Sequence, residues 1–144
     1  MINSNNFVYS ASAAARILGI KIYSIVRFEI WAYVCFVHVE GCRPTFISKK
    51  AFKQHFVEWR IERAQGMAVN QIEHDRFQVT NFRKNSIYSI WLFEDGLDCE
   101  CEDYKNQIMI FGNGKACCKH AYAVLRFLGH NRLSDYVSAN ALAT

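Results

Sequence analysis

The chain has 144 residues, 51% hydrophobic and 21% charged, so it can bury a core and is not a disordered polymer. One proline and seven glycines exclude a collagen-like or linker-type architecture. The formal charge of +4 is unevenly spread. Residues 1–70 carry nine bases and four acids, a net +5, and residues 71–144 carry eight bases and nine acids, a net −1. The basic N-terminal half indicates a polyanionic partner.

Charged residues interrupt the most hydrophobic N-terminal stretch, so no segment approaches the roughly 18 uncharged apolar residues that span a membrane. The same charges break any secretory signal. We therefore expect a cytoplasmic protein with no membrane partner.

The N-terminal half predicts two short helices, a hairpin and a long helix. Ser10 or Ser12 is a suitable N-cap for a helix that ends at Gly19, and a second helix is expected over 21–28. Strands over 31–39 and 45–47 flank a turn, and Ser48 begins a helix that runs to about Ala64.

This order resembles the winged helix-turn-helix of the excisionase and MerR families, through Ala14-Arg16-Leu18-Gly19-Ile20 and the stretch Phe46-Ile47-Ser48 to Phe52. The resemblance implies that the second helix reads the major groove of double-stranded DNA while the wing touches the backbone. The implied DNA contacts are Lys21, Tyr23, Ser24 and Arg27 on that helix and Arg43 on the wing. On the long helix, Lys49, Lys50 and Lys53 are candidate phosphate contacts or, equally, a solvated face.

The expected recognition helix departs from that pattern, because it carries two bases among many apolar residues. Surplus apolar surface of this kind is more typical of a core or a protein interface than of a DNA contact. The alternative to DNA binding is therefore that this surface contacts a protein partner or forms a homodimer.

The C-terminal half begins after an expected linker over 67–76. Residues 77–93 alternate in polarity, Asp95-Gly96 supplies a hairpin turn, and Leu97 to Cys101 returns as the partner strand. Cys118-Lys119-His120 then opens a helix that Gly129 closes. The expected domains are residues 1–66 and 77–144.

Four of the six cysteines lie in this half, beside a histidine. Cys99 and Cys101 are two apart on a strand, so they project to one face, and Cys118 and His120 lie at a helix start. Four such soft or borderline ligands predict one structural Zn²⁺ with a closed shell. The alternatives are Cys117 in place of Cys118, or buried thiols that merely cluster. A redox dithiol is a weaker reading, because no Cys-x-x-Cys is present.

Cys99-x-Cys101, sixteen residues, then Cys118-x-His120 leading into Ala121-Tyr-Ala-Val-Leu125 resembles a SWIM zinc finger, and Asp103-Tyr104 resembles its acidic-aromatic step. The resemblance implies a zinc finger that binds DNA or protein beside a second module. Glu94, Asp95 and Asp98 are unspaced charges around a turn, and no phosphate-cradling glycine loop is present, so no enzyme is expected.

The sequence therefore predicts an α+β chain: a small winged-helix-like module followed by a ββα-type zinc finger. Its expected role is that of a non-enzymatic DNA-binding or regulatory protein. The acidic Cys-x-Cys edge would repel phosphates, so any nucleic-acid contact of this half is expected through its bases, which are Lys115, Lys119, Arg126 and Arg132.

Overall fold

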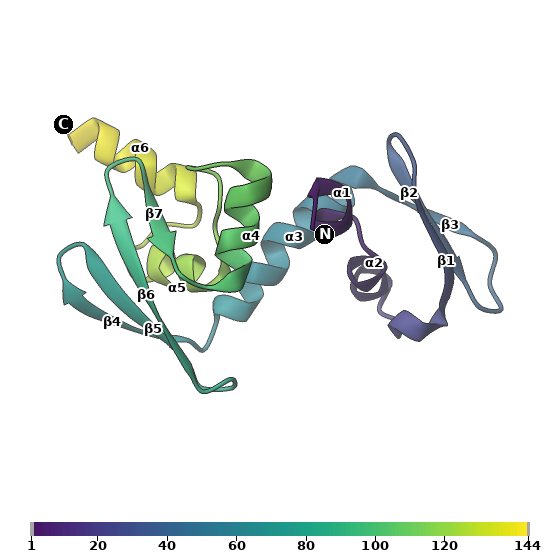
Figure 1. Cartoon of the computed structure of the whole chain (residues 1–144), viewed down its shortest axis with the longest axis horizontal. Helices are drawn as coiled ribbons and strands as arrows, with labels where there is room; N and C mark the ends of the chain where they lie inside the picture. Colours follow the sequence, from purple (N-terminus) through teal and green to yellow (C-terminus); the bar gives the residue numbers. More distant parts are fainter. Residues whose placement is uncertain (1, 144) are drawn as a thin grey trace. The chain divides into compact units, whose positions relative to one another are not determined.

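The computed structural model describes residues 2–143 and has an α+β architecture with two antiparallel sheets (Figure 1). The chain divides into two compact units, an N-terminal unit up to Trp59 and a C-terminal unit from Arg60. No helix in the described part of the chain is long and apolar enough to cross a bilayer.

The N-terminal unit builds a three-stranded sheet, in the order β1-β2-β3, together with helices. Its elements are α1 (Ser4–Val8), α2 (Ala11–Leu18), the 3₁₀ turn η1 (Ile22–Ser24), β1 (Ile25–Ile30), β2 (Val34–Val39), β3 (Thr45–Ser48) and the start of α3 (Lys49–Ala64).

Helix α2 matches the expected helix at both ends. The Ser10 hydroxyl accepts a hydrogen bond from the Ala13 amide at 3.1 Å, and Gly19 ends the helix with a left-handed φ of 69°. The Ser48 hydroxyl likewise accepts from the Ala51 amide at 3.1 Å at the start of α3. Local capping residues therefore fixed both helices where the sequence predicts them.

The prediction of a second helix over 21–28 is wrong. Only Ile22–Ser24 is helical, as one 3₁₀ turn, and β1 follows at once and pairs with β2 from Ile25 to Ile30. The apolar spacing fits either period, but from Arg27 onward polar and apolar residues alternate, and the segment is rich in β-branched and aromatic side chains. Hydrogen bonding to β2 therefore makes this segment a strand and not a helix.

The core of the N-terminal unit lies between one sheet face and the helices. Cys35 and Val37 of β2 are fully buried, while Phe36 between them faces the other way. Phe52 of α3 is fully buried and meets the rings of Tyr9 and Phe28 edge-on, with centroids 5.7 and 6.1 Å away.

The C-terminal unit builds a four-stranded sheet, in the order β4-β5-β6-β7, with helix α5 packed against it (Figure 1). Its elements, after the end of α3, are β4 (Ala68–Glu73), β5 (Arg76–Asn81), β6 (Ser86–Phe93), β7 (Gly96–Cys99), α4 (Glu102–Phe111), α5 (Lys119–Phe127) and α6 (Leu133–Ala143). The hairpin β6–β7 with its turn at Asp95-Gly96 and helix α5 are confirmed. The expected return strand over 97–101 is too long, because β7 ends at Cys99 and Cys101 instead caps α4.

Strand β4 occupies most of the segment 67–76 expected as a linker. It pairs with β5 at the edge of the sheet, and four of its six residues are exposed. An edge strand with so little burial shows no hydrophobic alternation, which hides it in the sequence. The core behind the sheet joins Phe77 and Ile90 to Val124 and Leu125 of α5, all fully buried.

Candidate metal centre

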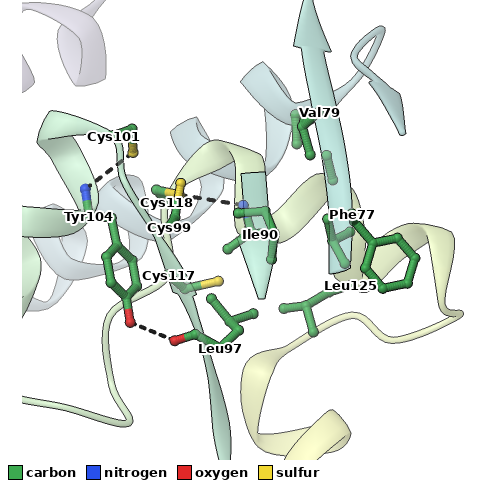
Figure 2. Close-up of a cluster of buried hydrophobic side chains, with 14 of the residues drawn as sticks. Phe77, Val79, Ile90, Leu97, Cys99, Cys101, Tyr104, Cys117, Cys118 and Leu125 are labelled. Carbon is green, nitrogen blue, oxygen red and sulfur yellow. Dashed lines mark hydrogen bonds between the residues drawn. The ribbon is translucent and has the colours of Figure 1, made fainter. Parts of the chain in front are cut away.

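Four buried side chains converge at one place in the C-terminal unit, and Figure 2 shows the three cysteines among them. They are Cys99, Cys101, Cys118 and His120, and their ligand atoms all lie within 4.8 Å of one another. None of the four residues is more than 4% exposed. The arrangement can hold one metal ion between a strand end and two helix starts.

Each cysteine is fixed by the element that it begins or ends. Cys99 is the last residue of β7 and pairs with Ile90 across the sheet. Cys101 is the N-cap of α4, and its sulfur accepts a hydrogen bond from the Tyr104 amide at 3.4 Å. Cys118 is the N-cap of α5, and its sulfur accepts from the Ala121 amide, also at 3.4 Å. Two helix N-termini therefore present their partial positive charge to the sulfurs, which favours thiolates.

His120 faces the sulfurs through Nδ1. That atom lies 3.8 Å from Cys118 Sγ and 4.0 Å from Cys99 Sγ. A tetrahedral zinc with bonds of about 2.3 Å to sulfur and 2.0–2.1 Å to nitrogen places S and N about 3.6 Å apart, so a small contraction completes the geometry. Nε2 is buried without a hydrogen-bond partner among the described residues, and the Tyr88 ring lies 4.7 Å from the imidazole ring.

The pKa values of the three thiols are shifted in different directions. Hydrogen bonds from the Cys118 and Cys99 thiols lower the pKa of Cys101, making it the first thiolate of the cluster. The hydrogen bond to Cys101 raises the pKa of Cys99 to about 12, and burial raises the pKa of Cys118. A divalent ion would remove this conflict, because it stabilises all three thiolates together.

Cys117 stands apart from the cluster. Burial raises the pKa of its thiol, which interacts with Tyr122. Its backbone is held by Gln107, whose Oε1 accepts from the Cys117 amide at 2.9 Å and whose Nε2 donates to the Cys117 carbonyl at 3.1 Å. The structure thus groups Cys118, and not its neighbour, with the other three side chains.

A polar network behind the centre involves Arg60, a residue that no pattern in the sequence singles out. The Arg60 guanidinium is buried and pairs with both Asp103 carboxylate oxygens, at 2.9 and 2.7 Å. Gln107 then donates to Asp103 at 3.0 Å as well as to the Cys117 carbonyl. The end of α3, helix α4 and the approach to α5 are therefore tied together. The arginine–acid spacing of 43 residues gave no local signal of this pair.

The residues predicted to contact DNA are not gathered on one helix. Lys21 directly precedes η1, Tyr23 and Ser24 lie within it, and Arg27 lies on β1, where it forms an ion pair with Glu29. Arg43 lies in the exposed turn between β2 and β3. The lysines at 49, 50 and 53 follow in the first turns of α3; the first packs its ammonium 5.0 Å from the Tyr9 ring, and the other two are exposed.

An exposed aromatic cluster occupies the outer face of the N-terminal sheet. It consists of Trp31, Phe36 and Phe46, with ring centroids 5.1–5.8 Å apart. Trp31 is 45% exposed and Phe46 52%, and neighbouring Tyr33 is 85% exposed. Contiguous aromatic surface of this kind is typical of an interaction site.

Comparison of the chain with protein-family models, curated proteins and solved structures gives no match. The resemblances to the SWIM finger and to the winged helix therefore stay predictions, carried by the residues named above.

Proposed function

We propose that this chain is a zinc-stabilised, non-enzymatic DNA-binding protein. The observation that carries the metal assignment is the buried group of three cysteines and one histidine. Thiolate and imidazole ligands in a four-coordinate set favour Zn²⁺ over hard cations such as Mg²⁺ or Ca²⁺. Four protein ligands leave no position for an activated water, which is the mark of a structural zinc.

Cys99, Cys101, Cys118 and His120 would hold the ion, and its role would be to fix the sheet edge against the starts of α4 and α5. Three thiolates on a divalent ion leave a local charge of −1. The two helix N-termini directed at the sulfurs offset that charge.

The DNA-binding part of the proposal is supported by the charge of residues 1–70, a net +5. Lys21, Arg43, Lys50 and Lys53 are exposed and can reach phosphates. Because the expected recognition helix is absent, we assign these residues to backbone contacts rather than to base readout.

Metal analysis and a salt series of duplex binding on the purified full chain test both parts. We expect one zinc per chain, and affinity for a duplex that falls steeply with salt as several phosphates are neutralised. Absence of stoichiometric zinc would overturn the metal assignment. Absence of salt-sensitive duplex binding would overturn the DNA-binding function.

A second function, protein association, is favoured by the exposed aromatic cluster. In that case Phe46→Ser would abolish a salt-insensitive dimer or complex, whereas Phe82→Ser, an equally drastic change at an exposed ring of the C-terminal unit, would not. Sedimentation of both variants at low and high salt distinguishes this function from DNA binding.

A further inference from the structure

A small cavity of about 90 Å³ opens on the C-terminal unit, where three segments meet. The end of α3 contributes Arg63, the β5–β6 loop contributes Arg83 and Lys84, and the first residue of α5 contributes Lys119. We propose that this cavity binds a phosphate group, supplied by the nucleic-acid backbone when DNA is bound. The source of the phosphate, though not the site itself, rests on the proposed DNA-binding function.

The charge of the residues around the cavity favours an anion. Four cationic side chains border the cavity, and among the described residues that line it there is no aspartate or glutamate. Like charges brought together at a partly enclosed surface repel one another more strongly than in bulk water. A bound anion converts that repulsion into attraction, and guanidinium groups match the oxygens of phosphate with paired hydrogen bonds.

The loop that carries two of these cations is held in place. The buried Asn81 side chain accepts hydrogen bonds from the Arg83 amide at 3.1 Å and the Lys84 amide at 3.4 Å. Asn85 closes the loop with a left-handed φ of 51°. The backbone that bears Arg83 and Lys84 is therefore ordered before any ligand arrives, which lowers the entropic cost of binding.

The volume of the cavity also favours a small ligand. The cavity is far below the roughly 300–1,000 Å³ of pockets for drug-sized ligands, so a small group such as phosphate fits it better than an extended substrate. Lys84 and Lys119 also border a neighbouring cavity of about 390 Å³ that contains Glu102 and Asp103. The negative charge of Glu102 repels an anion there, so the first cavity, with no acid among its described lining residues, is the one that suits phosphate.

The test compares two double variants of the zinc-loaded full chain that remove the same charges. Arg83→Gln with Lys84→Gln alters the cavity. Lys105→Gln with Arg76→Gln removes one lysine and one arginine from α4 and β5, at positions that neither line the cavity nor are expected to contact DNA. Binding of a labelled 20-base-pair duplex and of a 20-nucleotide single strand is measured by anisotropy over a salt series. Amide NMR shifts are followed during addition of inorganic phosphate, against sodium chloride of equal ionic strength.

We expect the cavity variant to bind DNA about 10-fold or more weakly and to lose about one unit of salt slope, with the control variant close to wild type. Phosphate should shift the amides of residues 82–84 and 119 in the wild type and the control only. Equal behaviour of the two variants, with no local phosphate shifts, overturns the site. Local phosphate shifts without any DNA binding would instead uphold the site and overturn the proposed function, with free phosphate as the ligand.

Discussion

Cys101 and Cys118 each perform two tasks, because each is both a candidate metal ligand and the N-cap of a helix. A serine in either position keeps the capping geometry while removing the thiolate. Substitution by serine therefore separates the metal-binding role from the capping role at a single residue.

We predict that Cys118→Ser loses zinc while Cys117→Ser keeps it. Loss of a direct ligand should weaken zinc binding by more than about 100-fold, since even outer-shell changes cost 10- to 100-fold. Atomic emission after dialysis against a weak chelator measures the zinc content of both variants. Retention of a full equivalent in Cys118→Ser, or its loss in Cys117→Ser alone, would show that the neighbouring thiol is the ligand.

Zinc affinity is predicted to rise with pH. In the metal-free centre the pKa of Cys99 is raised to about 12 and that of Cys118 is also raised, so near neutral pH both thiols hold protons that the metal must displace. Cys101, whose pKa is lowered, releases none in that range. Each displaced proton makes affinity fall about tenfold for each pH unit downward, so two protons give about 100-fold.

Chelator competition between pH 7 and 9, corrected for protonation of the chelator, measures this slope. An affinity independent of pH would mean that the three thiolates are already formed before the metal binds.

At the scale of the elements, contacts to the metal centre, to α3 and to β7 hold the first turns of α4 in place. Cys101 caps it on the side of the metal centre, and Asp103 and Gln107 join it to Arg60 and to the Cys117 backbone. The Tyr104 hydroxyl adds a bond to the Leu97 carbonyl at 2.6 Å, which fastens the helix to β7 (Figure 2). Most of the segment between the two Cys-containing pairs thus forms a helix that the surrounding contacts hold in place.

Arg60→Gln is predicted to destabilise α4 by about 1.5–3 kcal/mol, because it removes a bidentate, charge-assisted pair and leaves a half-buried carboxylate without its guanidinium. Hydrogen exchange of the α4 amides in the zinc-loaded protein measures the change. Lys105→Gln, an exposed position on the same helix, is the control and should change protection by less than about 0.5 kcal/mol. Equal effects of the two substitutions would remove the network from the account.

The contrast between the centre and β1 explains what the sequence could predict. The close spacing of Cys99 with Cys101 and of Cys118 with His120 is a local signal, and the structure brings all four together, although Cys101 caps α4 and does not lie on the strand as expected. The segment 21–28 carried an ambiguous period, and its strand state depends on hydrogen bonds to β2, ten or so residues away. The pairing of β4 and the Arg60–Asp103 contact are likewise non-local, so neither left a readable pattern.

At the scale of the whole molecule, the candidate metal ligands all belong to the C-terminal unit, and the exposed aromatic cluster belongs to the N-terminal unit. The N-terminal unit has its own core around Phe52, Val37 and Cys35, and none of the candidate metal ligands found among the described residues belongs to it. The C-terminal core, by contrast, includes all three cysteines of the centre as packed side chains. Metal binding and packing are therefore coupled in the C-terminal unit, whereas the N-terminal core packs without a candidate metal site.

Removal of zinc by a chelator is therefore predicted to unfold the C-terminal unit and to spare the N-terminal unit. Without the ion, three buried sulfur groups must share protons in a space shaped for a metal, and the edge of the sheet loses its tie to α4 and α5. Hydrogen exchange before and after chelation measures this for each unit separately. Amides of β5, β6 and α5 should lose most of their protection, whereas amides of α2 and β2 should keep theirs. Protection lost throughout would show that the two units fold as one, and protection kept throughout would show that the ion contributes nothing to the fold.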